Sequence, residues 1–373
     1  MRNGRDVAVV LHWYAEPLVH HRTAGTLKIV HVNLARGFRG GERQTALLIE
    51  ALSSRRNLQQ ILVCRKDSPL RRTLTDAPGL RFVSANLQLA GHSAVGPADV
   101  VHAHEAKAVH WALLHHALKR TPYVVTRRVD APVKDKRINR ASYRRAAARV
   151  AISRVIQRQL ESRGWGRVAL IPSAFAGLSR STEVTQRFRA EFPGKFLVGH
   201  AGAVVDRHKG QRVLLEAARH LAVCAPDMQF VFFGKGEDLA ALQAESADLP
   251  NVTWLGFKEN IGDYLAGLDV FAFPSRNEGL GSVLLDVMDL GIPIIASDAG
   301  GIPDIVQHQK TGLLVDNGDA EALAEGLIQL RDEPGLRERL VRGAAECLHD
   351  YSAEAMAKAY LSLYQNIING PRS

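Results

Sequence analysis

Short β-branched runs alternate with helical patterns along most of the chain, and this alternation constrains the fold more than any other feature. The apolar runs at residues 27–32, 60–64, 229–233 and 270–273 are each followed by a polar loop and then by helical spacing. Successive parallel strands need a crossover of this kind. Repeated βαβ units therefore predict an α/β protein with doubly wound parallel sheets.

The 373 residues are enough for two domains, each with its own core. The alternation occurs twice, and a small, polar segment at 173–182 separates its two halves. We therefore expect one domain over residues 27–172 and a second over 173–350, followed by a helix over 351–373 with apolar residues at i, i+4 spacing. Residues 1–26 fit no pattern and are interpreted as an N-terminal extension, either disordered or preceding the true start.

Composition places the chain among globular proteins that are not exported. Hydrophobic residues make up 46% and charged residues 23% of it. The apolar run at residues 7–11 is too short to span a bilayer and lacks a cleavage site for signal peptidase. The three cysteines are far apart, with no C-x-x-C, which fits reduced thiols in a cytoplasmic protein.

Charge is divided unevenly between the two halves. Residues 1–172 contain 30 lysines and arginines against 11 acidic residues, a balance of +19. The rest of the chain contains 18 against 27, a balance of −9. An arginine-rich composition that reflected a GC-rich genome would enrich both halves and does not explain the split. The split indicates that the first half meets an anionic partner or a negatively charged membrane surface.

The segment 270–286 joins an apolar strand to a polar loop and then to a helical pattern. Glu278 stands in the loop before Gly279 and Gly281, and Asp286 follows eight positions later. Eight positions are a little over two helical turns, so both acids can project toward one end of a site. Backbone N–H groups around Leu280 and Gly281 would face the same site and favour a phosphate oxygen. Two acids around a diphosphate are what a nucleotide-sugar site needs.

This segment resembles the E-x7-E region of retaining glycosyltransferases of family 4, and the resemblance continues through 291–301 and 311–316. It implies the GT-B fold, in which two Rossmann-like domains face each other across a cleft and the final helix returns to the first domain. It also implies that Glu278 orients the donor sugar, that Asp286 holds the ribose, and that Leu280, Gly281 and Ser282 contact the donor phosphates. The family usually has Glu where this chain has Asp286.

The loop 202–210 resembles the strand–loop–Lys-Gly segment in which relatives clamp the donor diphosphate. Lys209 keeps the lysine and is expected to be catalytic, while Ala203 stands where relatives carry an arginine that Arg207 could replace. Fixed cations stabilise the charge that develops on a departing diphosphate. The loops that follow the next two apolar runs place Gly234 and Phe257 among the expected donor-binding residues. An exposed lysine at a helix start remains the alternative for Lys209.

The first half offers three further motifs. Gly40 and Gly41 resemble the glycine loop of the family, where the backbone approaches the donor closely. His102 and His104 resemble the family's Asp-x-x-His-x-His segment, with Asp99 in the acidic position, and His104 is expected to bind the acceptor. Two histidines at i, i+2 share a strand face, but the sequence shows no third ligand nearby, so a metal is not expected.

Arg127 and Arg128 stand where many relatives carry a histidine that contacts the donor sugar. Guanidinium groups match carboxylates and phosphates with two parallel hydrogen bonds. The pair therefore predicts an anionic acceptor, and the basic segment 134–140 extends the same character. A solvated basic surface is the alternative interpretation.

Together these features predict a retaining glycosyltransferase that moves a sugar from a nucleotide-sugar to an anionic glycan or glycolipid, such as the lipopolysaccharide core. No cofactor and no metal are expected, since the chain contains no Asp-x-Asp. The expected location is the cytoplasm, with peripheral contact at the cytoplasmic face of the inner membrane. The alternatives are a nucleotide-sugar 2-epimerase of the same fold and, because of the basic half, a nucleic-acid-binding protein. Sparse aromatics, 6% of residues, argue against nucleic acid.

Overall fold

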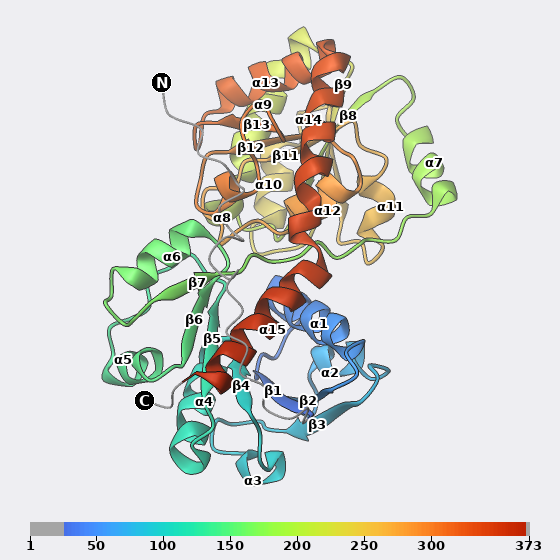
Figure 1. The fold of residues 1–373 in the computed structure, drawn as a ribbon. Coiled ribbons are helices and arrows are strands. Elements are labelled where there is room, and N and C mark those ends of the chain that lie inside the picture. The colour runs from blue at the N-terminus through green and yellow to red at the C-terminus, as the bar shows by residue number, and fades with distance from the viewer. Residues whose placement is uncertain (1–25, 371–373) are drawn as a thin grey trace. The chain divides into compact units, whose positions relative to one another are not determined.

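The computed structural model describes residues 26–370, so the predicted extension lies, except for its last residue, outside the described part of the chain. The described chain forms two compact units. The first contains the chain up to Ser173 together with the segment that begins at Ala353, and the second is Ala174–Ser352. Each unit is an α/β structure built on one parallel sheet (Figure 1).

The first unit is a seven-stranded sheet in the order β3-β2-β1-β4-β5-β6-β7. Its strands are β1 (Leu27–Asn33), β2 (Leu58–Cys64), β3 (Leu80–Ser84), β4 (Val100–Ala103), β5 (Tyr123–Arg127), β6 (Ala148–Ala151) and β7 (Val168–Leu170). Its helices are α1 (Gly40–Ser53), α2 (Pro69–Thr73), α3 (His92–Val95), α4 (Ala106–Lys119), α5 (Arg137–Arg144), α6 (Arg154–Glu161) and α15 (Ala353–Asn369).

The order of strands in this unit reverses between β1 and β4. These strands pair in parallel, with His31 opposite His102, and the Asp99 carboxylate accepts a hydrogen bond from the Lys28 backbone N–H at 2.8 Å. Asp99 therefore fixes the register at the start of β4. Ligands of doubly wound folds bind beyond the carboxyl ends of the strands at such a reversal. In this unit the segment after β1 contains Gly40, and His104 follows the end of β4.

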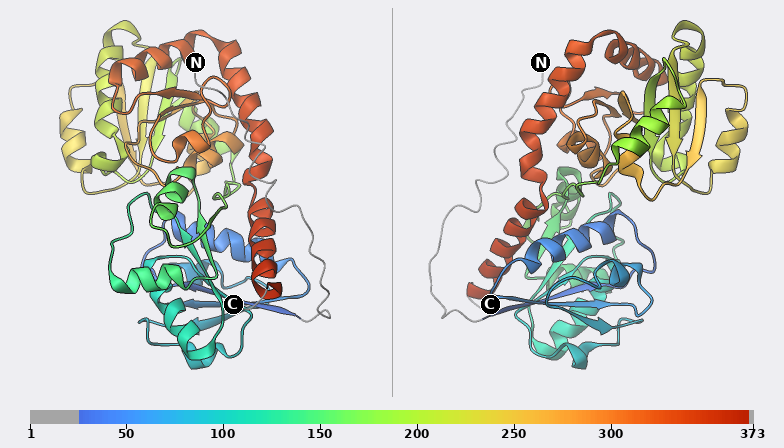
Figure 2. Two further views of the ribbon diagram at one scale, coloured as in Figure 1. Left: turned by 60° about the vertical axis from the view of Figure 1, so that its left-hand side comes forward. Right: turned by 90° about the vertical axis from the view of Figure 1, so that its right-hand side faces the viewer.

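The C-terminal helix α15 belongs to the first unit and packs against α1 (Figure 2). Its buried face carries Met356, Ala357, Tyr360, Leu363 and Tyr364. The expected apolar stripe at i, i+4 spacing is thus the face that meets the rest of this unit. The hydroxyl groups of Tyr360 and Tyr364 on that face contact Thr126 and His102 of the sheet.

The second unit is a six-stranded parallel sheet in the order β10-β9-β8-β11-β12-β13. Its strands are β8 (Phe196–Ala201), β9 (Met228–Phe233), β10 (Val252–Gly256), β11 (Val270–Phe273), β12 (Ile294–Ser297) and β13 (Leu313–Val315). Its helices are α7 (Thr182–Ala190), α8 (Asp206–Lys209), α9 (Gln211–Cys224), α10 (Leu239–Glu245), α11 (Ile261–Leu265), α12 (Val283–Asp289), α13 (Ala320–Asp332) and α14 (Pro334–Leu348), with 3₁₀ turns η2 (Ile302–Asp304) and η3 (His349–Tyr351).

The prediction of doubly wound parallel sheets is confirmed, and the strand order of the second unit reverses between β8 and β11. The short edge strands β3 and β13 were not predicted, because a strand with one neighbour needs less apolar sequence than a central one. The helix α12 begins at Val283, later than expected, so Asp286 lies in its first turn. Among residues 26–370, no helix combines the length and apolar character that crossing a bilayer requires.

Candidate functional site

The second unit brings Lys209 and Glu278 together as an ion pair, one from the end of α8 and the other from the loop after β11. Both are mostly shielded, with 22% of the Lys209 side chain and 13% of the Glu278 side chain exposed. The Lys209 Nζ atom also lies 5.5 Å from the centre of the Phe273 ring. A partly desolvated pair of this kind interacts more strongly than an exposed one.

The two loops are joined by their backbones. The N–H of Arg276 donates to the His208 carbonyl at 2.8 Å. At Gly210, where φ is 64°, a Cβ atom would lie 2.1 Å from the Pro274 carbonyl oxygen. Only glycine adopts this left-handed conformation at so close an approach without strain. The backbone therefore holds Lys209 and Glu278 in register without a ligand.

The Glu278 loop also contacts the segment that follows β12. The Gly301 N–H donates to the Glu278 carbonyl at 2.9 Å, and a Cβ at Gly301 would lie 2.3 Å from the Gly279 oxygen. Gly281 has a φ of 82°, which turns the chain just before Ser282 at the start of α12. Leu280 is buried in this turn. These contacts explain why the glycines of 279–301 accompany Glu278 in the sequence.

Asp286, which is expected to hold the ribose, has a partner within the protein. It is buried, and its Oδ1 atom accepts a hydrogen bond from the Ala176 N–H at 2.6 Å. The carboxylate therefore fastens the segment that enters the second unit. The sequence could not reveal this contact, since Ala176 lies 110 positions earlier.

Three other residues expected to bind the donor have contacts of their own. Arg207 is 68% exposed and pairs with Glu237 at 2.6 Å, so it does not take part in the Lys209–Glu278 pair. Gly234 lies against Gly202, where a Cβ would approach the carbonyl oxygen to 1.9 Å. Phe257 is exposed and its ring centre lies 4.6 Å from Lys235 Nζ. Arg207 is therefore paired with Glu237, and the Phe257 ring is exposed to solvent.

Sequence reasoning missed a buried polar group behind Lys209. The His200 Nδ1 atom donates to the Ala272 carbonyl at 3.0 Å, which leaves Nε2 as the acceptor for Gln211 at 3.4 Å. Burial lowers the pKa of His200 to about 4, and Lys209 contributes in the same direction. The Gln211 Oε1 and Ser275 Oγ atoms are buried without a hydrogen-bond partner. The signal was available, since His200 lies one residue before the end of β8, the strand that precedes Lys209.

The first unit gathers three buried histidines at the carboxyl ends of β1 and β4. His31 Nδ1 lies 3.0 Å from His104 Nε2, and the His102 and His104 ring centres lie 3.8 Å apart. Burial lowers the pKa of each, in His31 to about 4, and Arg128 adds to the effect on His102 and His104. The cluster is therefore neutral at pH 7.

The reason given for excluding a metal, that no third ligand lies nearby, is wrong. His31 completes a set with His102 and His104 whose ligand atoms lie within 4.8 Å of one another. The ring nitrogens of this set nevertheless have other partners. His102 contacts the Tyr364 hydroxyl at 2.6 Å and the Thr126 hydroxyl at 2.7 Å, and a guanidinium group lies beside His104. Such partners and such a charge disfavour a cation.

The structure separates the two adjacent arginines. Arg127 turns back on its own loop and donates to the Ala131 carbonyl at 2.5 Å. Arg128 lies beside His104, with its Nη2 atom 3.5 Å from the His104 Nδ1 atom. Its Nε and Nη1 atoms are shielded from solvent and have no hydrogen-bond partner. Of the two, Arg128 is the one placed at the carboxyl ends of the central strands.

Gly40 and Gly41 form the first turn of α1 beside Arg128. A Cβ atom at Gly41 would lie 3.7 Å from the Arg128 Cδ atom. The helix start is organised by Glu42, whose Oε2 atom accepts from the Arg39 N–H at 2.9 Å. The expected glycine loop, His104 and Arg128 are thus neighbours at one end of this sheet.

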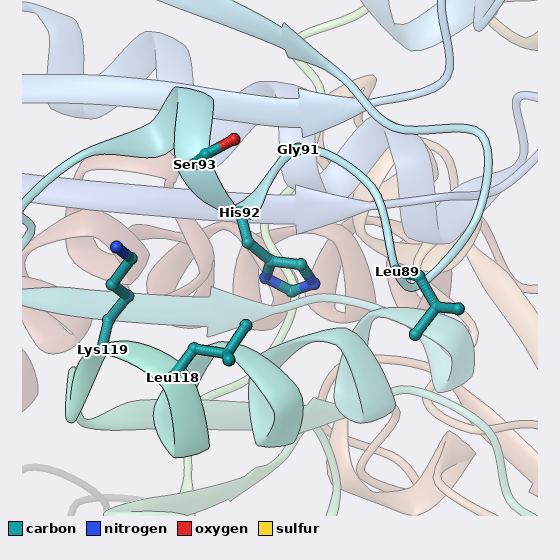
Figure 3. A pocket seen from close by; sticks show the side chains of 6 residues that line it. All are labelled: Leu89, Gly91, His92, Ser93, Leu118 and Lys119. Atoms are coloured by element: carbon teal, nitrogen blue, oxygen red, sulfur yellow. The ribbon is translucent and has the colours of Figure 1, made fainter.

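A separate hollow of about 320 Å³ lies on the first unit, lined by residues of α3, the loop before it and the end of α4 (Figure 3). His92, in its wall, stacks on Trp111 with ring centres 4.3 Å apart. The start of α4 follows His104, so the end of α4 at Leu118 and Lys119 lies toward the opposite edge of the sheet. This hollow is therefore not part of the arrangement around Arg128.

Comparison with known proteins shows what the second unit is similar to. Residues 183–346 match the family described as Glycosyl transferases group 1. The chain is 32% identical over 213 residues to the lipopolysaccharide core biosynthesis glycosyltransferase LpsE of Rhizobium meliloti, which covers 56% of this chain and 61% of that protein. The match thus spans less than two thirds of that relative. Over 283 residues the chain is 26% identical to the phosphatidyl-myo-inositol mannosyltransferase of Mycobacterium leprae, covering 73% and 74%.

Solved structures agree on the fold. The Anabaena protein HepE in complex with UDP has a TM-score of 0.79 at 20% identity, covering 91% of this chain and all of that one. A glycosyltransferase of Rickettsia africae has a TM-score of 0.80 at 18% identity, covering 93% of this chain. The expected fold, two Rossmann-like units of the GT-B class, is confirmed.

Proposed function

Because residues 183–346 match the family described as Glycosyl transferases group 1, we propose that the chain transfers a sugar from a nucleotide-sugar to an anionic acceptor, with retention at the anomeric carbon. The acceptor is a lipopolysaccharide core or a related envelope glycan. The observation that carries the proposal is the Lys209–Glu278 ion pair at the reversal of strand order in the second unit. The names of LpsE and of the UDP complex of HepE support it.

The pair suits the charge changes of the reaction. As the glycosidic bond to the nucleoside diphosphate breaks, negative charge develops on the phosphate, and the fixed Lys209 ammonium group stabilises it. Glu278 holds that ammonium group and orients the sugar hydroxyls. The acceptor hydroxyl attacks the face from which the diphosphate leaves, and a phosphate oxygen takes its proton. This route uses no nucleophile from the protein and no metal.

The first unit supplies the acceptor site in this proposal. Its sequence carries the +19 charge balance, and Arg128 lies beside His104 and the start of α1. The same unit exposes Leu87, Leu89 and Leu118. Exposed leucines with basic neighbours fit peripheral contact with an anionic lipid surface. We therefore place the protein in the cytoplasm, at the inner face of the inner membrane.

A direct assay tests the proposal. The purified chain is incubated with a panel of nucleotide-sugars and a phosphorylated core oligosaccharide, and products are identified by mass spectrometry. We expect a product one sugar heavier, formed equally well in excess EDTA, and an α-linkage from an α-configured donor by NMR. The absence of any product across the panel would overturn the proposal, and full inhibition by EDTA that Mg²⁺ restores would overturn the metal-free route.

The same assay separates the alternatives. An epimerase converts the nucleotide-sugar without acceptor, so a changed sugar in the donor-only reaction would favour it. A nucleic-acid-binding protein would instead retain duplex DNA, with an affinity that falls steeply as salt rises. We expect neither result.

A further inference from the structure

His200 links the two central strands of the second unit at the point where their backbones separate. The last paired residues of β8 and β11 are Gly199 and Phe271. His200 follows Gly199, and its Nδ1 atom donates to the Ala272 carbonyl at 3.0 Å. The side chain therefore continues the link between the strands beyond their last backbone pair. Because strand order reverses here, this bridge lies where the loops after both strands begin.

Gln211 closes the loop that carries Lys209. It follows Gly210 directly, and its Nε2 atom donates to the Ala203 carbonyl at 3.0 Å, near the start of the same loop. The same Nε2 atom lies 3.4 Å from His200 Nε2. The buried His200 ring, whose pKa is lowered to about 4, is neutral at pH 7 and carries its proton on Nδ1. Its Nε2 atom therefore accepts from Gln211.

The two contacts of the Gln211 nitrogen fix the orientation of its amide group. Both neighbours, the Ala203 carbonyl and His200 Nε2, are acceptors, so the amide nitrogen faces them and Oε1 points away. Oε1 is buried and has no hydrogen-bond partner among residues 26–370. A buried acceptor without a partner is costly. The orientation is thus set by the nitrogen, which holds the loop, and not by the oxygen.

The Lys209 side chain passes beside these contacts. A Cβ atom at Gly202 would lie 3.8 Å from Lys209 Cε and 3.9 Å from His200 Nε2, so both lie on the same side of Gly202. The ammonium group at the end of that side chain pairs with Glu278, whose loop follows β11. Gln211 therefore ties the two ends of the Lys209 loop together, and His200 ties them to the strand that leads to Glu278.

We propose that His200 and Gln211 are positioning residues that hold the Lys209 ammonium group where the diphosphate leaves the nucleotide-sugar. The inference rests on the proposed function, which assigns Lys209 to the leaving group. When Glu278 binds the sugar hydroxyls, its hold on the ammonium group weakens. The hydrogen bonds from Ala272 through His200 and Gln211 then keep the loop in place. Neither positioning residue touches the substrate.

The first test reads the proton on His200. In the full-length chain labelled with ¹⁵N-histidine, long-range ¹H–¹⁵N spectra distinguish the two neutral forms of each ring, and the signal lost in His200→Asn belongs to His200. We expect the proton on Nδ1 at pH 7. A proton on Nε2 would overturn the inference, because two N–H groups would then face each other between His200 and Gln211.

The second test measures binding of inorganic pyrophosphate, by calorimetry on the full-length chain. Gln211→Met removes both N–H groups while keeping the length of the side chain, and we expect it to weaken binding about tenfold. Gln229→Met is the matched control, since Gln229 is also buried in this unit but donates to Thr253 from the start of β9. It should leave binding within about twofold. Equal losses in the two variants would overturn the inference.

Lys209→Met separates positioning from a general role in the structure. In that background, Gln211→Met should weaken pyrophosphate binding by no more than about a further twofold, because the group through which it acts is absent. The same loss in both backgrounds would overturn the inference, as would unchanged binding in Lys209→Met alone. If Gln211→Met does not fold, His200→Asn replaces it, since asparagine keeps a donor for the Ala272 carbonyl and removes the acceptor for Gln211.

Kinetics separate this inference from the proposed function. In a chain that transfers sugar, Gln211→Met should lower kcat about tenfold and leave the acceptor KM unchanged. An unchanged kcat would overturn the inference and leave the proposed function standing. Pyrophosphate binding that depends on Gln211 through Lys209, in a chain that transfers no sugar, would keep the positioning residues and reject the proposed function.

Discussion

Glu278 and Lys209 are held together by backbone contacts between their loops, before any substrate is considered. We predict that Glu278→Gln keeps the fold and lowers the transfer rate about a hundredfold, because a preorganised charged contact is commonly worth about 3 kcal/mol at the transition state. The measurement is kcat with a saturating nucleotide-sugar and acceptor.

Glu237 offers a matched control for this variant. It also pairs with a basic side chain, Arg207, but on an exposed surface. Glu237→Gln should leave kcat nearly unchanged, since exposed ion pairs contribute little. If Glu278→Gln retained more than half of the unmodified turnover, Glu278 would not belong to the site.

The Asp286 carboxylate, which is expected to hold the ribose, also accepts a hydrogen bond from the Ala176 N–H within its own unit. Asp286→Ala removes the acceptor of the Ala176 N–H, so we predict a loss of about 1–3 kcal/mol in the free energy of unfolding, measured by urea denaturation. Asp289→Ala, at an exposed position of the same helix, should change it little. A raised donor Kd with unchanged stability would instead support the ribose contact that the family resemblance implies.

At the scale of elements, α15 connects the end of the chain to the polar cluster of the first unit. The Tyr364 hydroxyl contacts His102 Nδ1 at 2.6 Å, and the Tyr360 hydroxyl contacts Thr126 at 2.9 Å. Packing of the buried face supplies the apolar part of this attachment. The hydroxyls make the attachment specific, since they satisfy groups that would otherwise be buried without partners.

We predict that Tyr364→Phe lowers the free energy of unfolding by about 1–3 kcal/mol, because the ring is kept while His102 Nδ1 loses its partner. Thermal and urea denaturation followed by Trp fluorescence would measure the loss. Gln365→Ala, exposed on the same helix, serves as the control. A variant as stable as the unmodified chain would show that the hydroxyl contact contributes nothing to the attachment of α15.

At the scale of the whole molecule, both units bury neutral histidines beside the ends of their central strands. Burial lowers the pKa of His31 in the first unit and of His200 in the second to about 4. The unfolded chain binds protons near pH 6.5, where these folded histidines do not. Stability is therefore fully present above pH 6.5 and decreases as the pH falls from 6.5 toward 4.

We predict that each of these two histidines lowers the free energy of unfolding by roughly 2 kcal/mol when the pH falls from 7 to 5. Urea denaturation at the two pH values would measure their contribution together with that of the other histidines whose pKa burial lowers, His102, His104 and His115. His200→Asn should reduce the pH dependence by about half of this pair's share, whereas substitution of the surface residue His220 should not. Equal stability at pH 5 and pH 7 would contradict the assignment of buried neutral rings.

The sequence by itself determined the fold class and the identity of several elements. The strands Met228–Phe233 and Val270–Phe273 lie where their patterns predict, because periodicity and glycine placement act over a few residues. The motifs around Lys209 and Glu278 were recognisable for the same reason: their glycines serve tight local turns.

The tertiary structure alone decided which distant groups meet. His31 joins His102 because β1 lies beside β4, and Gln60 reaches His31 because β2 lies on the other side of β1. Neither pairing follows from local spacing, since strand order is set by the packing of the whole sheet. The same holds for Asp286 and Ala176, and for the separation of Arg127 from Arg128. A sequence specifies which side chains are present at a strand end, and only the folded sheet determines which of them contact one another.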